Sequence, residues 1–434
     1  MTDSTRNHRF NASRRRLLQA GAGAFDWKRF KGEKIEVFLV KSPRGDLLTK
    51  YHKEFEDLTG ISVGSEMVPE QQQRQKAVIE FNSGNPSFDV IALSYHVQKR
   101  QFAKNNWLTD LRPMLTDKSL VDPNLDFDDF AQGGLNYAVE TDGRVNSLPL
   151  NLDPWVVYYN RELFDAKGIA FPKTFAEMID AAAKLNDPSK GVSGFVARGL
   201  KNANVPVWTS FLLGYGGSFI DKNGKLLTDS PEAIEGAKMY QTLLAKYGPA
   251  GVAGYNWNEA QSLFLQGKAA MWLDGIGFAQ PLEDPTKSRI AGKVGYGVMP
   301  AGPKQQVSAL FGDGEGVSTY SKKKGPSWFY LQWASNKNNQ TRMLQAAAGA
   351  PVRKSAYAAA QASSEFKAPK QWVECMLASA RIAQPGLPVI APVTEFRDVF
   401  GVALTNMING ADPATELKKA TAEFQPVLDK SEKS

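Results

Sequence analysis

Polar and aromatic residues that could hold a small polar molecule alternate at positions 151–155. Asn151, Asp153 and Trp155 stand immediately before the apolar run at 156–159, which is typical of a strand. An amide, a carboxylate and an aromatic ring supply hydrogen-bond donors, acceptors and a flat apolar face. Two alternatives stay open. Asp153 precedes a proline and could simply form a turn, and Trp155 could be a core residue at the start of the strand.

The residues that most often carry metal or nucleophilic chemistry are scarce. The chain has one cysteine, Cys375, and three histidines, His8, His52 and His96. A single thiol excludes an intramolecular disulfide and a cysteine-based metal cluster. A zinc site or a Ser-His-Asp arrangement would have to use His52 or His96, and we expect His52 at the surface of an amphipathic helix. The sequence predicts no catalytic residue, no metal site and no cofactor.

The length and composition are those of an ordinary globular protein. The 434 residues, of which 42% are hydrophobic and 22% charged, are enough for two domains with separate cores. The formal net charge is +7, and residues 1–24, with five Arg and one Asp, carry more than half of this excess. The basic bias is therefore largely N-terminal, and we expect no nucleic-acid partner.

The first 24 residues resemble a twin-arginine export leader. Arg14-Arg15-Arg16 is followed by two leucines and by the small-residue run at 20–24, which suits a signal peptidase. The apolar part is short because Asp26 and Lys28 follow at once, so the alternative is a basic tail. We expect a shortened leader at 1–24 and a periplasmic location. No other stretch approaches the roughly 20 apolar residues that a membrane span needs.

Apolar runs and helical periodicities alternate between residues 35 and 93. The pattern predicts strands at 35–40, 61–68 and 89–93 and helices at 47–58 and 71–82. This βαβαβ order predicts an α/β fold with parallel strands. Ligands of such sheets bind at the carboxyl ends of the strands, which are followed here by residues 41–45, 69–72 and 94–96. No glycine-rich phosphate loop stands at these positions, so we expect no nucleotide site.

Three further patterns occur in a fixed order. In the first, Tyr158-Tyr159-Asn160 is followed by Leu163-Phe164, by Gly168-Ile169 and by P-x-T-x-x-E at 172–177, where Thr174 and Glu177 have the spacing of a capping box. The second, F-x-x-G-K-A-A-M, fills 264–271, and the third runs from Ser321 through 328–333 to Ser355. In this order the patterns resemble the bacterial extracellular solute-binding proteins of family 1, the receptors of ABC importers for sugars and polyols.

The resemblance implies an α/β, two-lobed periplasmic-binding-protein fold with a ligand cleft between lobes that a multi-crossing hinge joins. Lobe one is expected at 30–150 plus 307–352 and lobe two at 151–306 plus 353–434, with crossings near Leu150, Val307 and Val352. The implied function is a non-catalytic periplasmic receptor that binds a sugar or polyol by hinge closure. It would deliver this solute to the membrane permease subunits of an ABC importer, and we expect a monomer.

Recognition of a sugar or polyol uses aromatic faces against C–H groups and planar polar side chains against hydroxyls. In the family, an acidic residue at the offset of Asp153 commonly accepts hydrogen bonds from hydroxyls. The predicted ligand-binding residues are Arg44, Glu70, Gln72, Tyr95, His96, Asn151, Asp153, Trp155, Asn204, Trp208, Asp274, Phe278, Asp313 and Arg353. Simpler alternatives stay open for three of them: His96 could cap a helix, Asp274 could form a turn, and Arg353 could pair a carboxylate at the hinge.

Three other functions would use part of the same pattern. A receptor for a phosphorylated polyol would need clustered arginines, and only Arg44, Arg198 and Arg353 are available. A receptor for a polyamine would need several acids around aromatic rings. A periplasmic glycosidase would use two carboxylates, such as Asp153 and Asp274. The mixture of side chains favours a neutral polyhydroxylated ligand.

Overall fold

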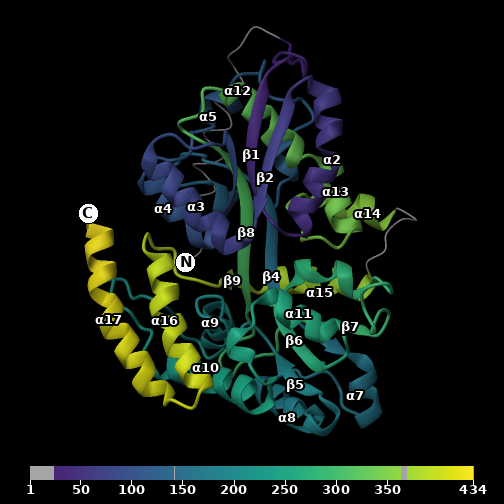
Figure 1. Ribbon diagram of the computed structural model, residues 1–434, viewed down its shortest axis with the longest axis vertical. Coiled ribbons are helices and arrows are strands. Elements are labelled where there is room, and N and C mark those ends of the chain that lie inside the picture. Colours follow the sequence, from purple (N-terminus) through teal and green to yellow (C-terminus); the bar gives the residue numbers. More distant parts are fainter. Residues whose placement is uncertain (1–23, 141, 363–368, 434) are drawn as a thin grey trace. The chain divides into compact units, whose positions relative to one another are not determined.

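The computed structural model describes residues 24–140, 142–362 and 369–433. The chain divides into two compact units, which Figure 1 shows coloured along the sequence. Unit 1 consists of Met1–Leu152 and Gly312–Phe366, and unit 2 consists of Asp153–Phe311 and Lys367–Ser434. The predicted export leader, apart from its last residue, lies outside the described residues.

Two of the passages between the units are strands. β4 (Leu148–Asn160) contains one boundary and β8 (Ser308–Val317) contains another, a few residues beyond the predicted crossings at Leu150 and Val307. The third passage differs more from the prediction, which placed it near Val352. The structure keeps residues 353–362 in unit 1, because Arg353 and Ser355 bond to unit 1 residues in the segment 125–129.

The first elements of unit 1 follow the predicted alternation. Its helices and strands, besides its parts of β4 and β8, are β1 (Lys34–Val40), α2 (Pro43–Thr59), β2 (Ser62–Val68), α3 (Glu70–Ser83), β3 (Val90–Ser94), α4 (Tyr95–Lys104), α5 (Arg112–Thr116), a 3₁₀ turn (Phe127–Asp129), α6 (Gln132–Ala138), α12 (Lys324–Ala334), α13 (Lys337–Gln345) and α14 (Lys354–Gln361). The strand order is β2-β1-β3-β8; β1 pairs parallel with β2 and β3, and β8 pairs antiparallel with β3. The predicted parallel βαβαβ unit is confirmed.

Local signals fix the ends of α2. The Ser42 side chain accepts a hydrogen bond from the Gly45 N–H at 3.2 Å, and Pro43 occupies the first helical position. At the other end Gly60 adopts a left-handed conformation with φ of 72°, and its N–H donates to the Glu56 carbonyl. The helix therefore begins directly after β1, and Arg44 stands in its first turn.

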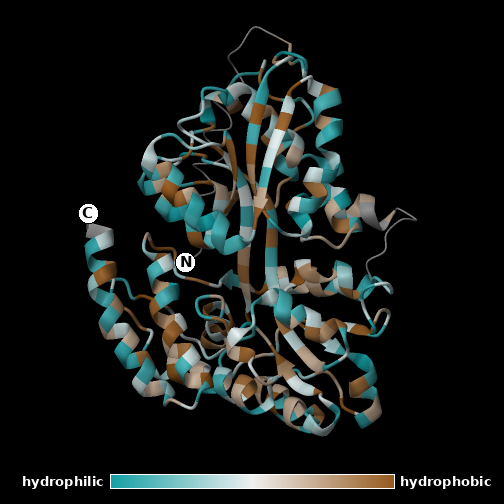
Figure 2. Ribbon diagram, in the orientation of Figure 1, coloured by the Kyte–Doolittle hydropathy of each residue, from teal (hydrophilic) through white to brown (hydrophobic). Residues whose placement is uncertain are grey.

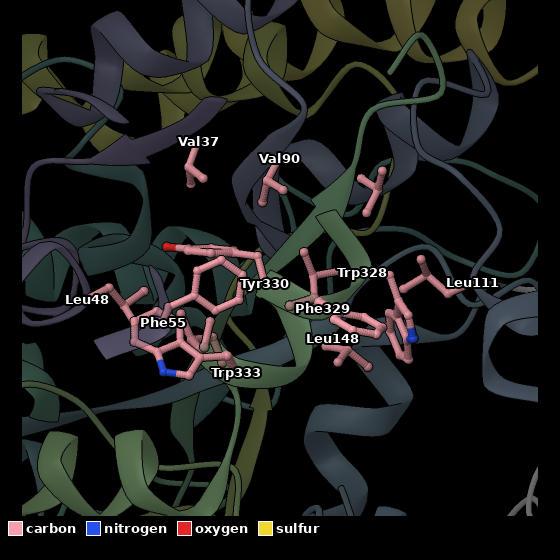
Figure 3. Packing of buried hydrophobic residues seen from close by; sticks show 14 of the residues in the cluster. Val37, Leu48, Phe55, Val90, Leu111, Leu148, Trp328, Phe329, Tyr330 and Trp333 are labelled. Carbon is pink, nitrogen blue, oxygen red and sulfur yellow. The ribbon is translucent and has the colours of Figure 1, made fainter. Parts of the chain in front are cut away.

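The core of unit 1 is rich in aromatic side chains. Figure 3 shows Tyr330 and Trp333 of α12 packed against Phe55 of α2. The prediction that His52 lies at the surface is wrong: its ring is buried, and Nε2 lies 2.9 Å from the Tyr330 hydroxyl. Removal from water lowers the pKa of His52 to about 4. The amphipathic pattern of α2 could not show that α12 covers this position.

Unit 2 is built mainly from helices around a short sheet. Its elements, besides its parts of β4 and β8, are α7 (Arg161–Lys167), α8 (Phe175–Leu185), β5 (Ser193–Val196), α9 (Val205–Gly214), α10 (Pro231–Gln241), α11 (Trp257–Leu265), β6 (Ala269–Gly275), β7 (Val294–Gly297), α15 (Lys370–Arg381), β9 (Ala383–Pro385), α16 (Val393–Ile408) and α17 (Pro413–Lys433), with shorter helical turns at Pro188–Lys190, Thr242–Lys246, Val252–Gly254, Ile276–Phe278 and Gln280–Leu282. β6 pairs antiparallel with β4 and parallel with β5. β7 pairs antiparallel with β4, and β9 pairs parallel with the first residues of β8.

The C-terminal helices α16 and α17 lie side by side in unit 2 (Figure 1). Figure 2 shows hydrophilic and hydrophobic residues alternating along α17, and Phe424 on its apolar side packs against Phe396 and Phe400 of α16. This is the pattern of an amphipathic helix that covers a core. Within the described ranges, none of the helices is long and apolar enough to cross a membrane.

β4 begins at Leu148, well before the strand predicted at 156–159. Asp153 and Trp155 therefore lie inside the strand, and the period of two in a strand puts their side chains on the same face. The alternative that Asp153 merely forms a turn before Pro154 is wrong. The local Asp-Pro signal is overridden because the neighbouring residues pair with β6, with Trp155 opposite Gly275.

Candidate functional site

In unit 2, four of the predicted site residues lie together at one edge of the sheet. Asp153 and Trp155 come from β4, and Asp274 comes from the end of β6. Phe278 ends the 3₁₀ turn that follows β6. The antiparallel register, in which Val156 lies opposite Asp274, brings these two distant parts of the sequence next to each other. We call Asp153, Trp155, Arg198, Asp274 and Phe278 the unit 2 cluster.

Arg198, the member of this cluster that was not among the predicted site residues, binds Asp274. Its Nε donates to Asp274 Oδ2 at 2.9 Å and its Nη2 donates to Oδ1 at 2.6 Å. The Gly275 N–H also donates to Oδ1, at 2.8 Å. Asp274 is fully buried inside β6, so its interpretation as a turn residue is wrong. A buried carboxylate is stable here because two charge-assisted hydrogen bonds match its charge.

Two aromatic rings flank the same guanidinium group. The Arg198 Cζ lies 5.1 Å from the ring centroid of Trp155 and 5.7 Å from that of Phe278, within the range of cation–π attraction. Phe278 in turn stacks on Trp257, with centroids 4.9 Å apart, and Trp155 contacts Phe311 at 5.1 Å. Trp155 is almost fully buried, whereas Phe278 and Trp257 are half-buried. Of these rings, Phe278 and Trp257 keep part of their surface accessible.

The Asp153 carboxylate is fixed by the backbone after β6. Its Oδ1 accepts a hydrogen bond from the Gly277 N–H at 2.9 Å. A Cβ at position 275 would lie 2.0 Å from Asp153 Oδ2, so glycine there leaves room for the carboxylate. Burial raises the pKa of the nearby Tyr158 hydroxyl well above its ordinary value, and the charge of Asp153 raises it further. A carboxylate offers about four lone-pair positions, so Asp153 is of a type suited to accept hydroxyl groups besides the Gly277 N–H.

Unit 1 holds a second, smaller polar cluster, which consists of Arg44, Asn151 and Asp313. Arg44 Nη2 lies 2.5 Å from Asp313 Oδ2, and Asn151 Nδ2 donates to the same oxygen at 3.4 Å. The Asn151 Oδ1 accepts from the Ala350 N–H at 2.8 Å. Because Asp313 pairs with Ser94 at the end of β3 and Arg44 follows β1, this unit 1 cluster lies at the carboxyl ends of parallel strands, where α/β sheets bind ligands.

Tyr95 and His96 open α4 directly after β3. Tyr95 is buried; its hydroxyl lies 2.8 Å from Ser147 Oγ, and its ring stacks on Tyr137 with centroids 5.3 Å apart. Burial raises the pKa of this hydroxyl far above its ordinary value. A Cβ at Gly314 would collide with the hydroxyl. Tyr95 therefore packs in the interior of unit 1, whereas His96 is half-buried.

The two predicted residues on α3 point in different directions. Glu70 forms an ion pair with Arg74 one turn later, at 2.5 Å, and Gln72 is exposed. It is the neighbouring Gln73 that is buried and reaches β3, where its Nε2 donates to the Ala92 carbonyl at 2.7 Å. Gln73, which was not among the predicted site residues, is therefore the glutamine of α3 that reaches the sheet, whereas Gln72 faces the solvent.

Asn204 and Trp208 are fully buried among the helices of unit 2. Asn204 precedes α9, and its Nδ2 donates to the carbonyl of Gly401 at 3.0 Å. Trp208 Nε1 donates to the Ala233 carbonyl at 3.0 Å, and its ring stacks on Phe400. Since these contacts join α9 to α10 and α16, we leave both residues out of the proposed site. A buried tryptophan and a ligand-stacking tryptophan look alike in the local sequence.

Arg353 is also used inside one unit. It is fully buried and donates to the carbonyls of Ser335 and Leu125, each at 2.6 Å. Its guanidinium lies 3.9 Å from the Phe130 centroid and 3.7 Å from the Asp129 carboxylate. Burial lowers its pKa to about 10. The structure thus agrees with the alternative in which Arg353 pairs a carboxylate, and not with a clamp on a ligand.

The described part of the chain contains no group of three or more His, Cys, Asp or Glu side chains placed to hold a metal ion. The Cys375 thiol is buried, and burial raises its pKa to about 12, so the thiolate that a nucleophile needs is disfavoured. The two clusters offer carboxylates, guanidinium groups, an amide and aromatic rings, which suit the binding of a polar molecule.

The sequence model of one protein family matches most of this chain. The family is described as bacterial extracellular solute-binding protein, and the match covers residues 41–341. This range includes every member of the unit 1 cluster and of the unit 2 cluster.

Curated relatives are similar over most of their length. The erythritol/L-threitol-binding protein of Mycolicibacterium smegmatis is 26% identical over 424 residues, which cover 91% of this chain and 86% of that protein. A probable amino-acid ABC transporter periplasmic-binding protein of Sinorhizobium fredii is 26% identical over 342 residues, covering 76% and 74%.

The fold also matches a solved structure. An ABC transporter solute-binding protein from Agrobacterium radiobacter, crystallised in complex with ribitol, superimposes with a TM-score of 0.83 at 26% sequence identity. The superposition covers 92% of this chain and 99% of the other.

Proposed function

We propose that this chain, which belongs to the family of bacterial extracellular solute-binding proteins, is the receptor of an ABC importer for a neutral polyol. Proteins of this family bind solutes and are not enzymes. The similarity to an erythritol/L-threitol-binding protein and to a ribitol complex supports the choice of a polyol. A hydroxylated chain of this kind carries no charge and offers donors and acceptors at each carbon.

The observation that carries the proposal is the composition of the unit 2 cluster. Asp153 supplies an acceptor beside the Gly277 N–H, and Phe278 supplies a half-buried ring. A polyol would place C–H groups against the ring and donate its hydroxyls to the carboxylate. Arg44, Asn151 and Asp313 of the unit 1 cluster are the proposed second set of contacts, because they combine donors and acceptors in the same way.

Hinge closure is the mechanism we propose for uptake. A ligand that contacts both units only in a closed form would shift the population towards that form. The closed receptor would then present itself to the permease subunits of the importer. We expect the receptor to do this as a monomer.

A thermal-shift panel tests the ligand class. It would contain erythritol, ribitol, mannitol and maltose together with glycine, putrescine and ribitol 5-phosphate. A ligand present at about 100 times its dissociation constant stabilises the folded form by roughly 2.7 kcal/mol, so a neutral polyol should raise the melting temperature clearly.

Other results of this panel would contradict the proposal. A shift with amino acids alone would favour the function named for the Sinorhizobium fredii relative. A shift only with putrescine or ribitol 5-phosphate would indicate a charged solute. In a separate assay, turnover of chromogenic glycosides would favour the glycosidase alternative.

For export we propose the twin-arginine route, on the basis of Arg14-Arg15-Arg16. In cells that lack the twin-arginine translocase, the full-length protein should remain in the cytoplasm. Normal export from such cells would show that another route is used.

A further inference from the structure

The cations in the two clusters are each matched by a carboxylate. In unit 2, Arg198 and Asp274 are joined by two parallel hydrogen bonds of 2.9 and 2.6 Å. In unit 1, Arg44 lies 2.5 Å from Asp313. Neither pair is a surface pair: Asp274 is fully buried, and the side chains of Arg44 and Asp313 are 18% and 21% exposed. Each cluster therefore contains one guanidinium whose charge is compensated within the protein.

We propose that the Arg198–Asp274 pair determines the charge selectivity of the unit 2 cluster, and the Arg44–Asp313 pair that of the unit 1 cluster, so that each cluster accepts uncharged polyhydroxylated solutes and rejects their phosphate esters. This inference rests on the proposed function, because it assumes that the two clusters contact the solute. It assigns Arg198 and Asp274 a role in specificity that neither residue type nor family membership would give them.

The physical reason is the cost of breaking a desolvated pair. Arg198 gives two of its five N–H donors to Asp274, and a phosphate that took these two donors would displace Asp274 and leave a fully buried carboxylate without its cation. If the phosphate approached without displacing it, the anion would meet the carboxylate of Asp274 or Asp313 at short range in a poorly screened environment. A hydroxyl group avoids both penalties because it carries no charge and can donate or accept.

The unit 2 pair also positions the aromatic rings. The two parallel hydrogen bonds fix the plane of the guanidinium, which lies 5.1 Å from the Trp155 centroid and 5.7 Å from the Phe278 centroid. A lysine at position 198 would keep the charge but would lose the two-pronged bond and the flat contact surface. Arg198 is therefore a positioning residue for Phe278 as well as a partner of Asp274.

Selectivity can be measured by calorimetry on the full chain with ribitol, erythritol, ribitol 5-phosphate and erythritol 4-phosphate. Wild type should bind each phosphate ester at least a hundredfold more weakly than its polyol. Asp274→Asn keeps the size of the side chain but removes its charge, so the Arg198 guanidinium loses the carboxylate that binds it with two hydrogen bonds. This variant should bind the esters at least tenfold more tightly than wild type, while its affinity for the polyols falls.

Two further variants keep the test decisive. Asp313→Asn makes the same change at the more exposed unit 1 pair, and this variant should also bind the phosphate esters more tightly than wild type. If Asp274→Asn does not fold, the ester affinity of Asp313→Asn tests the inference in its place. Asp180→Asn removes one negative charge from the exposed pair with Lys184 on α8 and controls for the change in net charge. It should leave the selectivity as in wild type.

The outcomes separate this inference from the proposed function. If wild type binds ribitol and ribitol 5-phosphate equally well, or if the folded Asp274→Asn and Asp313→Asn variants gain no ester binding over Asp180→Asn, the inference is overturned and the polyol function stands. If wild type binds no neutral polyol at all, the proposed function fails, and the inference fails with it.

Discussion

Asp153 is the residue on which the proposed binding site depends most. Its carboxylate lies inside β4, accepts from the Gly277 N–H at 2.9 Å and shares the unit 2 cluster with Phe278. We expect Asp153→Ala to weaken polyol binding by about 1.5 to 3 kcal/mol, because it removes a charged acceptor from a desolvated site. Calorimetry on the folded variant would measure this. Asp180→Ala, at an exposed position on α8, should bind as wild type does, and an unchanged affinity of Asp153→Ala would mean that Asp153 only packs.

Glu315 gives a prediction about stability and pH. It is buried on β8, its carboxylate oxygens have no hydrogen-bond partner among the described residues, and burial raises its pKa to about 8. Between the unfolded pKa of 4.5 and about 8, the unfolded chain loses this proton while the folded protein keeps it. The contribution of Glu315 to stability is therefore complete below this window and falls by about 1.4 kcal/mol per pH unit across it.

The variant Glu315→Gln should remove this dependence, because an amide does not titrate. Urea unfolding of wild type and variant at pH 5 and pH 8 would show the variant gaining stability relative to wild type as the pH rises. The comparison cancels the opposite contribution of His52, whose lowered pKa destabilises the folded protein as the pH falls below 6.5. Parallel pH profiles would show that the Glu315 carboxylate finds a partner.

At the scale of the elements, the N-terminus of α8 allows a test of whether the predicted capping motif stabilises the fold. The Thr174 Oγ1 accepts from the Glu177 N–H at 3.2 Å, and Glu177 Oε2 accepts from the Lys173 N–H at 2.7 Å. The predicted capping pattern is thus present, although the glutamate reaches the residue before the cap. We expect Thr174→Ala to lower the free energy of unfolding by about 1 kcal/mol, as measured by urea titration. Ser262→Ala, at an exposed position inside α11, is the control and should be nearly neutral.

The strands β4 and β8 connect the two units and also carry candidate site residues. β4 carries Asn151 of the unit 1 cluster and, two residues later, Asp153 of the unit 2 cluster. β8 carries Asp313 in unit 1 and Phe311, which packs on Trp155, in unit 2. The segments that connect the units therefore also carry candidate site residues, so a change in these strands would affect both clusters.

For the whole molecule, the periplasmic-binding-protein fold implied by the sequence is confirmed by the likeness to a solved solute-binding protein at a TM-score of 0.83. Hinge closure is the proposal that follows from this family, and it predicts a change of shape. Small-angle scattering should give a smaller radius of gyration with saturating ribitol than without it. Glycine at the same concentration serves as the control. An identical profile at saturating polyol would rule out a large closure and favour a rigid site.

The sequence by itself determined the parallel βαβαβ start and the cap of α8 at Thr174, and it indicated the family to which the chain belongs. The first two depend on local chemistry, namely the period of apolar residues and a side-chain cap. It also placed Arg44 and Asp313, which meet in unit 1, among the site residues. The strands and the cap can be predicted because each is decided by residues that are close in the sequence, whereas the contact between Arg44 and Asp313 joins residues that are far apart.

Only the tertiary structure decided which polar and aromatic side chains lie together. Arg198 and Asp274 meet because β5 and β6 are neighbours in the sheet, and nothing near either residue shows it. Trp208 and Arg353 matched the predicted site in type, yet contacts with α10, α16 and the segment 125–130 bury them in the interior. Burial and charge pairing depend on partners far along the chain, and the local sequence does not contain them.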